Sequence, residues 1–276
     1  MVLEIQNYLF SFDLRALKYI SIFIIGVSIG INCYTQELEY SSPEYLGEDL
    51  DYTISYGFIN AGVANMSFKM DTASNMFLIN ITGRTIGVAN AIYKILDIYD
   101  CYVDPETNLP VKAIRNVREG SYREYNEVVF DHHSWSDSAI AVSQKSGLHI
   151  LPKNILDILT AFYYLRTEYI LKGLEVGEIV EIKTYFTDEL WDFRVRYAGK
   201  ETIKTQFGKI DCLKFNPVTE VGRAFKTNDD MTFWISDDKN LIPIKVRVDL
   251  RVGKFKIKLE KYKGLNNEFS SLHTKK

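Results

Sequence analysis

Residues 231–260 have the sequence MTFWISDDKNLIPIKVRVDLRVGKFKIKLE, and this stretch decides the fold class. Apolar side chains occupy every second position on both sides of the polar segment SDDKN and again after Gly253. Alternation with period two is typical of β-strands, and Ser, Asp and Asn favour turns. The stretch therefore predicts three consecutive antiparallel strands. In the last one, apolar side chains alternate with Lys254, Lys256 and Lys258, so one face is predicted to meet the core and the other, basic face to meet water.

The same alternation continues outward along the chain. It occupies residues 50–58, 64–70, 77–81, 112–118, 123–131, 134–142, 180–186, 191–197, 202–207 and 210–215. Asn60-Ala61-Gly62 is predicted to form the turn between the first two of these stretches, and Gly208 the turn between the last two. Residues 88–98 fit a short helix and a strand equally well.

One helix is predicted in the middle of the chain. Pro152 and Asn154 provide a start signal, and Gly173 provides a stop. Between them, apolar side chains share one face at helical spacing: Ile155, Ile158, Leu159, Phe162 and Tyr169. The fold class that we expect is mainly β, a single curled antiparallel sheet or half-barrel with this one helix packed against its concave face.

Composition is that of an ordinary globular protein. The chain has 276 residues, a net charge of −3 and a pI near 5.9, which gives no reason to expect binding to nucleic acid. Aromatic residues make up 13% of the chain and suit half-buried sheet surfaces. No repeat or low-complexity linker interrupts the pattern. One β-rich domain is therefore expected over residues 45–264, followed by a flexible tail at residues 265–276.

The N-terminus resembles an export signal. Tyr19–Ile31 is an uncharged apolar stretch, too short to cross a hydrocarbon core of ~30 Å but suitable for a signal peptide. Arg15 and Lys18 precede it, and small residues permit cleavage after Thr35. Residues 1–35 are therefore predicted to be a signal peptide. The mature protein would be periplasmic or otherwise exported, with membrane contact only through the N-terminal segment.

The three cysteines leave alternatives open. The N-terminal segment could instead stay as an uncleaved anchor, or be lipidated at Cys33, although Gly30 and Asn32 match a lipoprotein signal poorly. Cys101 and Cys212 remain after cleavage. An exported location permits a disulfide between them, and two buried thiols that act as small hydrophobic residues are the other alternative.

Arg166 is the most informative charged residue of the sequence. At 100° per residue it falls in the middle of the apolar stripe of the predicted helix. A charge there needs a partner, because removing it from water costs several kcal/mol. Three interpretations follow: a buried pair with an acidic residue or strand carbonyls, a side chain that reaches water, or a guanidinium that orients the anionic head group of a ligand.

Aromatic side chains on the predicted strands form the rest of the candidate ligand site. They are Tyr56, Phe58, Trp191, Phe193 and Trp234. The simplest interpretation is ordinary core. The functional interpretation is an apolar groove on the concave side of the sheet, suited to a lipid or a peptide.

Motifs for catalysis and metal binding are missing from the sequence. His132 and His133 are adjacent in sequence, so on a strand they would point in opposite directions and could not easily share a metal. The acidic pair Asp237-Asp238 fits a hairpin turn. We expect no catalytic residue, no metal and no cofactor, because nucleophile elbows, phosphate loops and zinc signatures do not occur.

Several segments resemble a bacterial family of exported proteins known as domain of unknown function 3108. They are Gly47–Tyr52, Ser55–Gly62, Asp157 with Tyr163–Arg166, Thr205–Phe215, Phe233–Asp238 and Leu241–Pro243. The resemblance implies a secreted or periplasmic β-rich domain and supplies no catalytic residues. The expected architecture is also similar to that of periplasmic lipoprotein carriers, whose curved sheet holds acyl chains, but fold alone does not fix function.

These observations predict an exported, non-enzymatic binder of an apolar or lipid-like ligand. Two alternatives come from other classes: an assembly factor that binds envelope proteins through a sheet edge, and a hydrolase that cleaves glycans with two carboxylates. A continuous cavity would favour the carrier. A solid core with a bare edge strand would favour the assembly factor, and two carboxyl groups facing each other across a cleft would favour the hydrolase.

Overall fold

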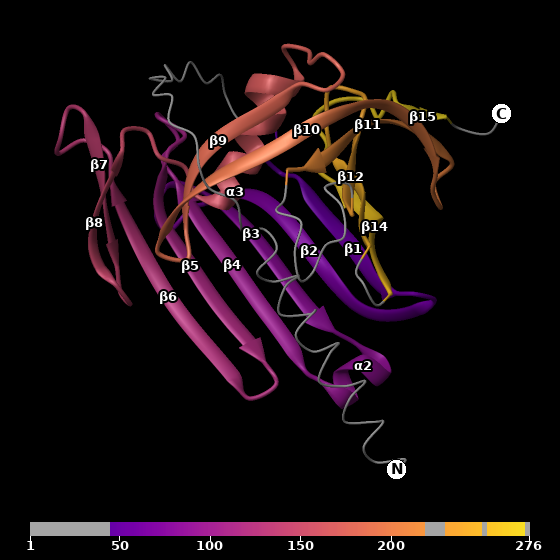
Figure 1. Ribbon diagram of the computed structural model, residues 1–276, viewed down its shortest axis with the longest axis horizontal. Coiled ribbons are helices and arrows are strands. Elements are labelled where there is room, and N and C mark those ends of the chain that lie inside the picture. The colour runs from indigo at the N-terminus through magenta and orange to yellow at the C-terminus, as the bar shows by residue number, and fades with distance from the viewer. Residues whose placement is uncertain (1–44, 219–229, 250–252, 274–276) are drawn as a thin grey trace.

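A computed structural model describes residues 45–218, 230–249 and 253–273 of the chain (Figure 1). The predicted signal peptide, its cleavage site near Thr35 and Cys33 lie outside the described residues. Within the described part, no helix has the length and apolar character needed to cross a membrane.

Antiparallel strands make up most of the structure, and the predicted fold class is confirmed. The first eight strands are β1 (Asp49–Tyr56), β2 (Ile59–Asp71), β3 (Met76–Thr85), β4 (Ile95–Val103), β5 (Pro110–Glu119), β6 (Tyr122–Asp131), β7 (Ser138–Ser143) and β8 (Gly147–Pro152). The remaining strands are β9 (Ile179–Phe186), β10 (Glu189–Lys204), β11 (Lys209–Pro217), β12 (Met231–Ser236), β13 (Pro243–Asp249), β14 (Lys254–Lys263) and β15 (Leu272–His273).

The strands form a nearly closed, barrel-like sheet. Its order is β8-β7-β6-β5-β4-β3-β2-β1-β14-β13-β12-β11-β10-β9, and β15 adds to β11. The pairing of β1 with β14 joins the two halves of the chain, which leaves β8 and β9 as the edges. Figure 1 shows the sheet curled around the helix, with β7 and β8 at one side and β9 and β10 arching over. Side chains connect β6 to the β9 side of the sheet. Asn126 of β6 donates a hydrogen bond to Asp188, and Tyr185 of β9 packs on Phe130 of β6.

The predicted helix forms, but it begins later than expected. Asp157, not Asn154, is the N-cap: its carboxylate accepts from the backbone N–H of Thr160, whose hydroxyl accepts from the N–H of Asp157 in return. Asn154 has a φ of +57° and lies before the helix. α3 (Ile158–Tyr164) then continues into the π-helical turn η1 (Leu165–Ile170).

The helix fills the interior of the sheet. Most of its residues are buried, including Leu159 and Tyr163 on one side and Ala161 and Leu165 on the other. It therefore belongs to two core clusters at once, one with residues of β1–β4 and β9–β14 and one with residues of β9–β12. A helix that is buried all round lies in a core rather than on a surface.

Several sequence predictions about single segments need correction. The first hairpin turns at Gly57-Phe58 and not at Asn60-Ala61-Gly62, which lies in β2. Residues 88–98 contain both a helix, α2 (Gly87–Ile92), and the start of β4. β8 was not predicted, and β10 is continuous where two separate strands were expected.

The C-terminal segment is also more ordered than the sequence predicts. Within residues 265–273, Leu265, Phe269 and Leu272 pack against the core, and β15 pairs with β11. The polar composition of this segment suggested a flexible tail. Its few apolar side chains nevertheless cover the end of the sheet.

Candidate functional site

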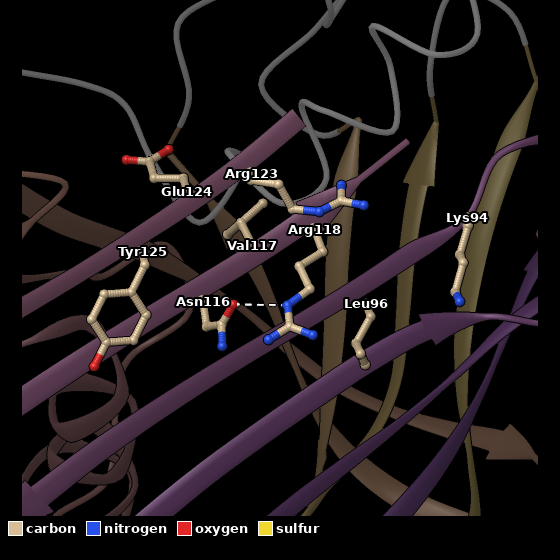
Figure 2. A pocket seen from close by; sticks show the side chains of 8 residues that line it. All are labelled: Lys94, Leu96, Asn116, Val117, Arg118, Arg123, Glu124 and Tyr125. Carbon is tan, nitrogen blue, oxygen red and sulfur yellow. Dashed lines mark hydrogen bonds between the residues drawn. The ribbon is translucent and has the colours of Figure 1, made fainter. Parts of the chain in front are cut away.

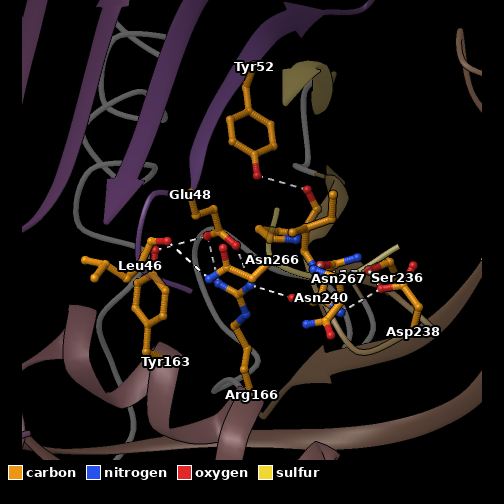
Figure 3. Close-up of polar contacts among 12 residues, drawn as sticks. Leu46, Glu48, Tyr52, Tyr163, Arg166, Ser236, Asp238, Asn240, Asn266 and Asn267 are labelled. Atoms are coloured by element: carbon orange, nitrogen blue, oxygen red, sulfur yellow. Dashed lines mark hydrogen bonds and ion pairs between the residues drawn. The ribbon is translucent and has the colours of Figure 1, made fainter. Parts of the chain in front are cut away.

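Arg166 lies in the middle of the molecule, where its side chain is completely buried. It extends from η1 toward the segment before β1 (Figure 3). Nη1 and Nη2 donate to Oε1 and Oε2 of Glu48 at 2.9 and 2.6 Å, and Nη2 also donates to the carbonyl oxygen of Asn240 at 2.7 Å. The interpretation as a buried ion pair is confirmed. The anionic partner that the third interpretation assigned to a ligand is Glu48 of the chain itself.

Aromatic rings surround this ion pair. The ring centroid of Tyr45 lies 3.8 Å from Cζ of Arg166, and the hydroxyl of Tyr163 donates to Oε1 of Glu48 at 3.1 Å. Burial lowers the pKa of Arg166, but the Glu48 carboxylate more than offsets it and the net pKa is raised. Burial, and then Glu48, raise the pKa of Tyr163. Both groups therefore keep their protons at neutral pH, so the cluster is a fixed cross-link.

The turn between β12 and β13 extends this network to the C-terminal segment. Asp238 accepts hydrogen bonds from the Ser236 hydroxyl and the Asn240 backbone N–H, which confirms the predicted hairpin turn. The same carboxylate accepts from the Ser271 hydroxyl at 2.7 Å. The side-chain oxygen of Asn240 accepts from the backbone N–H of Asn267 at 3.1 Å. Asp238 thus has a structural role, because it anchors the segment after β14.

The five predicted aromatic ligand residues do not come together in one groove. Phe58 is 98% exposed at the tip of the first hairpin. Tyr56 packs on Phe255, with ring centroids 4.8 Å apart, in a small cluster of its own. On β10, Trp191 and Phe193 are half-buried, and Phe193 packs against the main core. The five residues are therefore dispersed over several parts of the described structure.

Trp234 has surroundings of a different kind. It is 2% exposed, and its indole N–H donates to Oε2 of Glu201 at 3.1 Å. Nζ of Lys245 lies 4.5 Å from the ring centroid, and Cζ of Arg247 lies 5.6 Å from it. Trp234 therefore differs from the other four predicted aromatic residues, because its ring lies beneath the cationic side chains of Lys245 and Arg247.

Two small cavities lie beside α3. A cavity between β4–β6 and β9 has a volume of about 40 Å³, and Arg115, Asp157, Tyr185 and Phe186 are among its lining residues. A second one beside α3, lined by residues such as Phe68 and Tyr163, has about 20 Å³. Drug-sized ligands need sites of about 300–1,000 Å³. These spaces hold a few water molecules at most.

A surface hollow over β4–β6 has a volume of about 520 Å³ (Figure 2). Its residues are mostly polar. Nε of Arg118 donates to Asn116 at 3.2 Å, and Nη1 of Arg123 donates to the carbonyl oxygens of Gly120 and Tyr122. Two of its cations therefore already have protein partners, and its lining does not suit an acyl chain.

Cys101 and Cys212 are both buried free thiols, so the disulfide alternative is not realised. Burial raises the pKa of Cys101 well above its ordinary value and that of Cys212 to about 12. Asp157 is likewise buried, which raises its pKa although it caps the helix. Neither thiol is a reactive nucleophile at neutral pH.

Of the two adjacent histidines, His132 has a structural role. His132 is buried, and its Nε2 lies 2.9 Å from the carbonyl oxygen of Pro110, whereas His133 is exposed. The structure brings no three His, Cys, Asp or Glu side chains of residues 45–218, 230–249 and 253–273 together in a group suited to a metal.

The edge of the sheet at β8 carries an exposed apolar surface that the sequence analysis missed. Val129, Val142 and Leu148 are direct cross-strand neighbours on β6, β7 and β8, and Ile140 lies opposite Ile150. Leu148 and Ile150 are 63% and 59% exposed, and Val129 and Val142 are 45% and 49% exposed. We call these five residues the β8 stripe. In the sequence, the only signal is that Leu148 and Ile150 flank His149, in a segment only six residues long.

Comparison with known proteins gives a family and a fold. The family described as "Protein of unknown function (DUF3108)" matches residues 51–260. No curated protein matches the chain. A solved structure, a β-barrel-like protein of domain of unknown function DUF1849 from Brucella abortus, is 10% identical with a TM-score of 0.54, over 79% of this chain and 97% of that one. A DUF1089 family protein from Pseudomonas aeruginosa is 11% identical with a TM-score of 0.22, over 85% of this chain and 98% of that one.

Proposed function

The chain belongs to the DUF3108 family of proteins of unknown function, and we propose from this premise that it is an exported, non-enzymatic binding protein that recruits a partner polypeptide by strand addition at β8. The observation that carries the proposal is the β8 stripe at an edge of the sheet, where no further strand of the described residues pairs with β8. The apolar segment Tyr19–Ile31 with its basic flank supports export.

The character of β8 supports strand addition. An unpaired edge presents backbone N–H and C=O groups to any extended chain, and proteins usually protect such edges with charged residues or bulges. The six residues of β8, GLHILP, contain neither Lys nor an acidic residue. Only the terminal Pro152 limits pairing. An edge without these protective features is suited to accept another strand.

The packed interior argues against the carrier alternative. A carrier of acyl chains needs a continuous apolar cavity, whereas α3 and its aromatic residues fill the space inside the sheet. The two cavities beside α3, of about 40 and 20 Å³, are far below the size of an acyl-chain site. The surface of β8 is thus the more suitable place for a ligand.

The partner that fits this edge is an extended segment with apolar side chains at every second position. Such a strand would continue the row Val129–Val142–Leu148, since directly opposed residues of paired strands point to the same face. Its other side chains would lie beside His149, on the opposite face of β8. The expected motif is therefore alternating apolar and small polar residues without charge next to the stripe.

Hydrogen exchange with a defined peptide tests the proposal. The probe is a synthetic peptide of alternating Val and Thr with a Lys at each end. Added to the protein, it should slow amide exchange in β8 and shift the NMR signals of the β8 stripe. The variant Ile150→Lys should abolish both effects, because a charge on the edge strand opposes pairing.

Val176→Lys is the matched control, because Val176 is 74% exposed and lies outside the strands. It should respond to the peptide as the unaltered protein does. The proposal fails if β8 gains no protection, or if Ile150→Lys and Val176→Lys respond alike. Self-association, detected as a concentration-dependent change in sedimentation of the peptide-free protein, would mean that a second copy occupies the edge instead.

A further inference from the structure

Four cationic side chains form two directly opposed pairs on β13 and β14. Lys245 lies opposite Lys258, and Arg247 lies opposite Lys256. Opposed residues of antiparallel strands point to the same face with Cβ atoms about 4.5–5.5 Å apart, and like charges in this arrangement destabilise the sheet. We call this face of β11–β14 the basic face. It contains the three alternating lysines of β14 that the sequence pattern placed toward water.

The basic face continues onto β12 and β11. Trp234 is the cross-strand neighbour of both Lys245 and Lys214, so its ring lies in the same row. The buried indole lies beneath Lys245 and Arg247, at the distances given above. Cation–π attraction to the Trp234 ring positions Lys245 and Arg247 without neutralising their charge.

Acidic residues neutralise only part of this face. Glu201 pairs with Lys214 at 3.3 Å, and Asp249 pairs with Arg247 at 3.0 Å. No carboxylate of the described residues forms an ion pair with Lys245, Lys256 or Lys258. Burial, and then the charges of Arg247, Lys256 and Lys258, act together to lower the pKa of Lys245, although Glu201 opposes them. The cations are therefore close enough to repel one another.

A surface hollow of about 410 Å³ adjoins the basic face. Lys214, Thr232 and Arg247 line it together with Arg196 and Asn216. The side-chain amide of Asn216 donates to the Thr232 hydroxyl at 3.1 Å, and Nη2 of Arg247 lies 3.4 Å from the same hydroxyl. Apolar residues such as Val176 and Ala198 form the rest of its wall. The hollow therefore offers hydrogen-bond donors on one side and has room for a small anionic group next to Arg247.

We propose that the basic face binds a phosphate-bearing anion, held between Lys245, Lys258 and Arg247 above Trp234. A phosphate group carries a charge between about −1.5 and −2 at neutral pH, enough to offset two neighbouring cations. Arg247 supplies the planar fork that suits phosphate oxygens, and the lysines supply point charges. This site is separate from β8, so it stands independently of the proposed strand addition.

The test compares two pairs of lysines that are opposed across the sheet. Lys245→Gln/Lys258→Gln removes two charges from the basic face, and Lys204→Gln/Lys209→Gln removes two from an exposed cross-strand pair on β10 and β11. Both variants therefore change the net charge equally. The probes are pyrophosphate, followed by calorimetry, and vesicles of phosphatidylcholine with phosphatidylglycerol, followed by co-sedimentation.

The first variant should weaken binding of pyrophosphate, of the vesicles or of both by at least about tenfold, the loss expected when a charge-assisted hydrogen bond is removed. The control should leave binding nearly unchanged. Pyrophosphate binding would identify a soluble phosphate compound as the source, and vesicle binding alone would identify a lipid head group. Equal weakening in both variants, or no binding of either probe, would overturn the proposal.

A stability measurement separates loss of the site from loss of the fold. Because the opposed lysines repel, Lys245→Gln/Lys258→Gln should raise the urea midpoint while it weakens anion binding. A lower midpoint together with lost binding would indicate damage to the sheet. In that case the single variant Lys258→Gln, at an exposed position, decides: unchanged binding of both probes would then overturn the proposal.

Discussion

Arg166 and Glu48 are 118 positions apart in the chain and form a two-point ion pair in the interior. Their side chains are 0% and 2% exposed. The pair joins η1 to the segment that leads into β1, and the Asn240 carbonyl joins both to the β12–β13 turn. Three distant parts of the chain therefore depend on one guanidinium, at the place where the sheet wraps around the helix.

Removal of one partner of this pair should destabilise the protein strongly. Arg166→Met leaves the Glu48 carboxylate buried without its cation, and we expect a loss of about 3–5 kcal/mol in the free energy of unfolding. The double variant Glu48→Leu/Arg166→Met should recover part of this loss, because no charge then remains buried. Urea unfolding followed by circular dichroism measures both.

Lys183→Met is the control for that experiment. Lys183 and Asp192 form an ion pair at 3.3 Å on the surface of β9 and β10, with Lys183 44% exposed. Its loss should cost at most about 1 kcal/mol. If Arg166→Met costs no more than Lys183→Met, the buried pair does not have the structural role that its burial indicates.

The sequence predicts this site only in part. The helical spacing of the apolar residues places Arg166 inside the core, which is enough to require a partner. It cannot identify Glu48, because nothing local connects two residues so far apart. The resemblance to the family covers Gly47–Tyr52 and so contains Glu48, but it gives this residue no role.

The strand pattern predicts the fold class well and the boundaries less well. The alternation of apolar and polar side chains is a local property of the sequence, and most of the strands in the structure show it. The ends of strands depend on backbone conformation, as at Gly57, whose φ of +59° sets the first turn although Asn60-Ala61-Gly62 has more typical turn residues. β8 escapes the pattern because the exposure of Leu148 and Ile150 is a property of the sheet edge and not of the segment.

His132 should make stability depend on pH. Burial lowers its pKa below the ordinary value of 6.5, despite the opposing hydrogen bond to the Pro110 carbonyl. The unfolded chain therefore gains a proton at a higher pH than the folded protein does. The stabilising contribution of His132 is complete above about pH 6.5 and is lost as the pH falls toward the folded pKa.

The variant His132→Gln should reduce this fall in stability between pH 7.5 and 5.5, values chosen on either side of the ordinary histidine pKa of about 6.5. His133→Gln is the matched control, because the side chain of His133 is exposed. Urea midpoints across this range measure the effect. If the urea midpoint of His132→Gln falls with decreasing pH as steeply as that of the unaltered protein, the pH dependence does not come from His132.

The buried thiols should be unreactive in the folded protein. Cys101 and Cys212 are inaccessible, and burial raises both pKa values, so little thiolate forms near neutral pH. Alkylation with iodoacetamide at pH 8, near the ordinary thiol pKa of about 8.5, should modify neither residue until urea is added. Peptide mapping by mass spectrometry reads the two sites separately from Cys33. Labelling of either site in the native state, or a disulfide-linked peptide, would show that the described packing is not the one in solution.

The first hairpin offers a direct test of the role of Phe58, which the sequence suggested as a ligand residue. Its side chain is 98% exposed, so Phe58→Asn should change the free energy of unfolding by less than about 0.5 kcal/mol. Gly57→Ala should cost more, about 1–2 kcal/mol, because an alanine at a φ of +59° places its Cβ in a strained position. Neither change should alter protection of β8 by the alternating peptide or binding of pyrophosphate to the basic face. Phe58→Asn could instead weaken peptide binding at β8 or pyrophosphate binding at the basic face while stability is unchanged. The tip of the first hairpin would then belong to one of these binding sites.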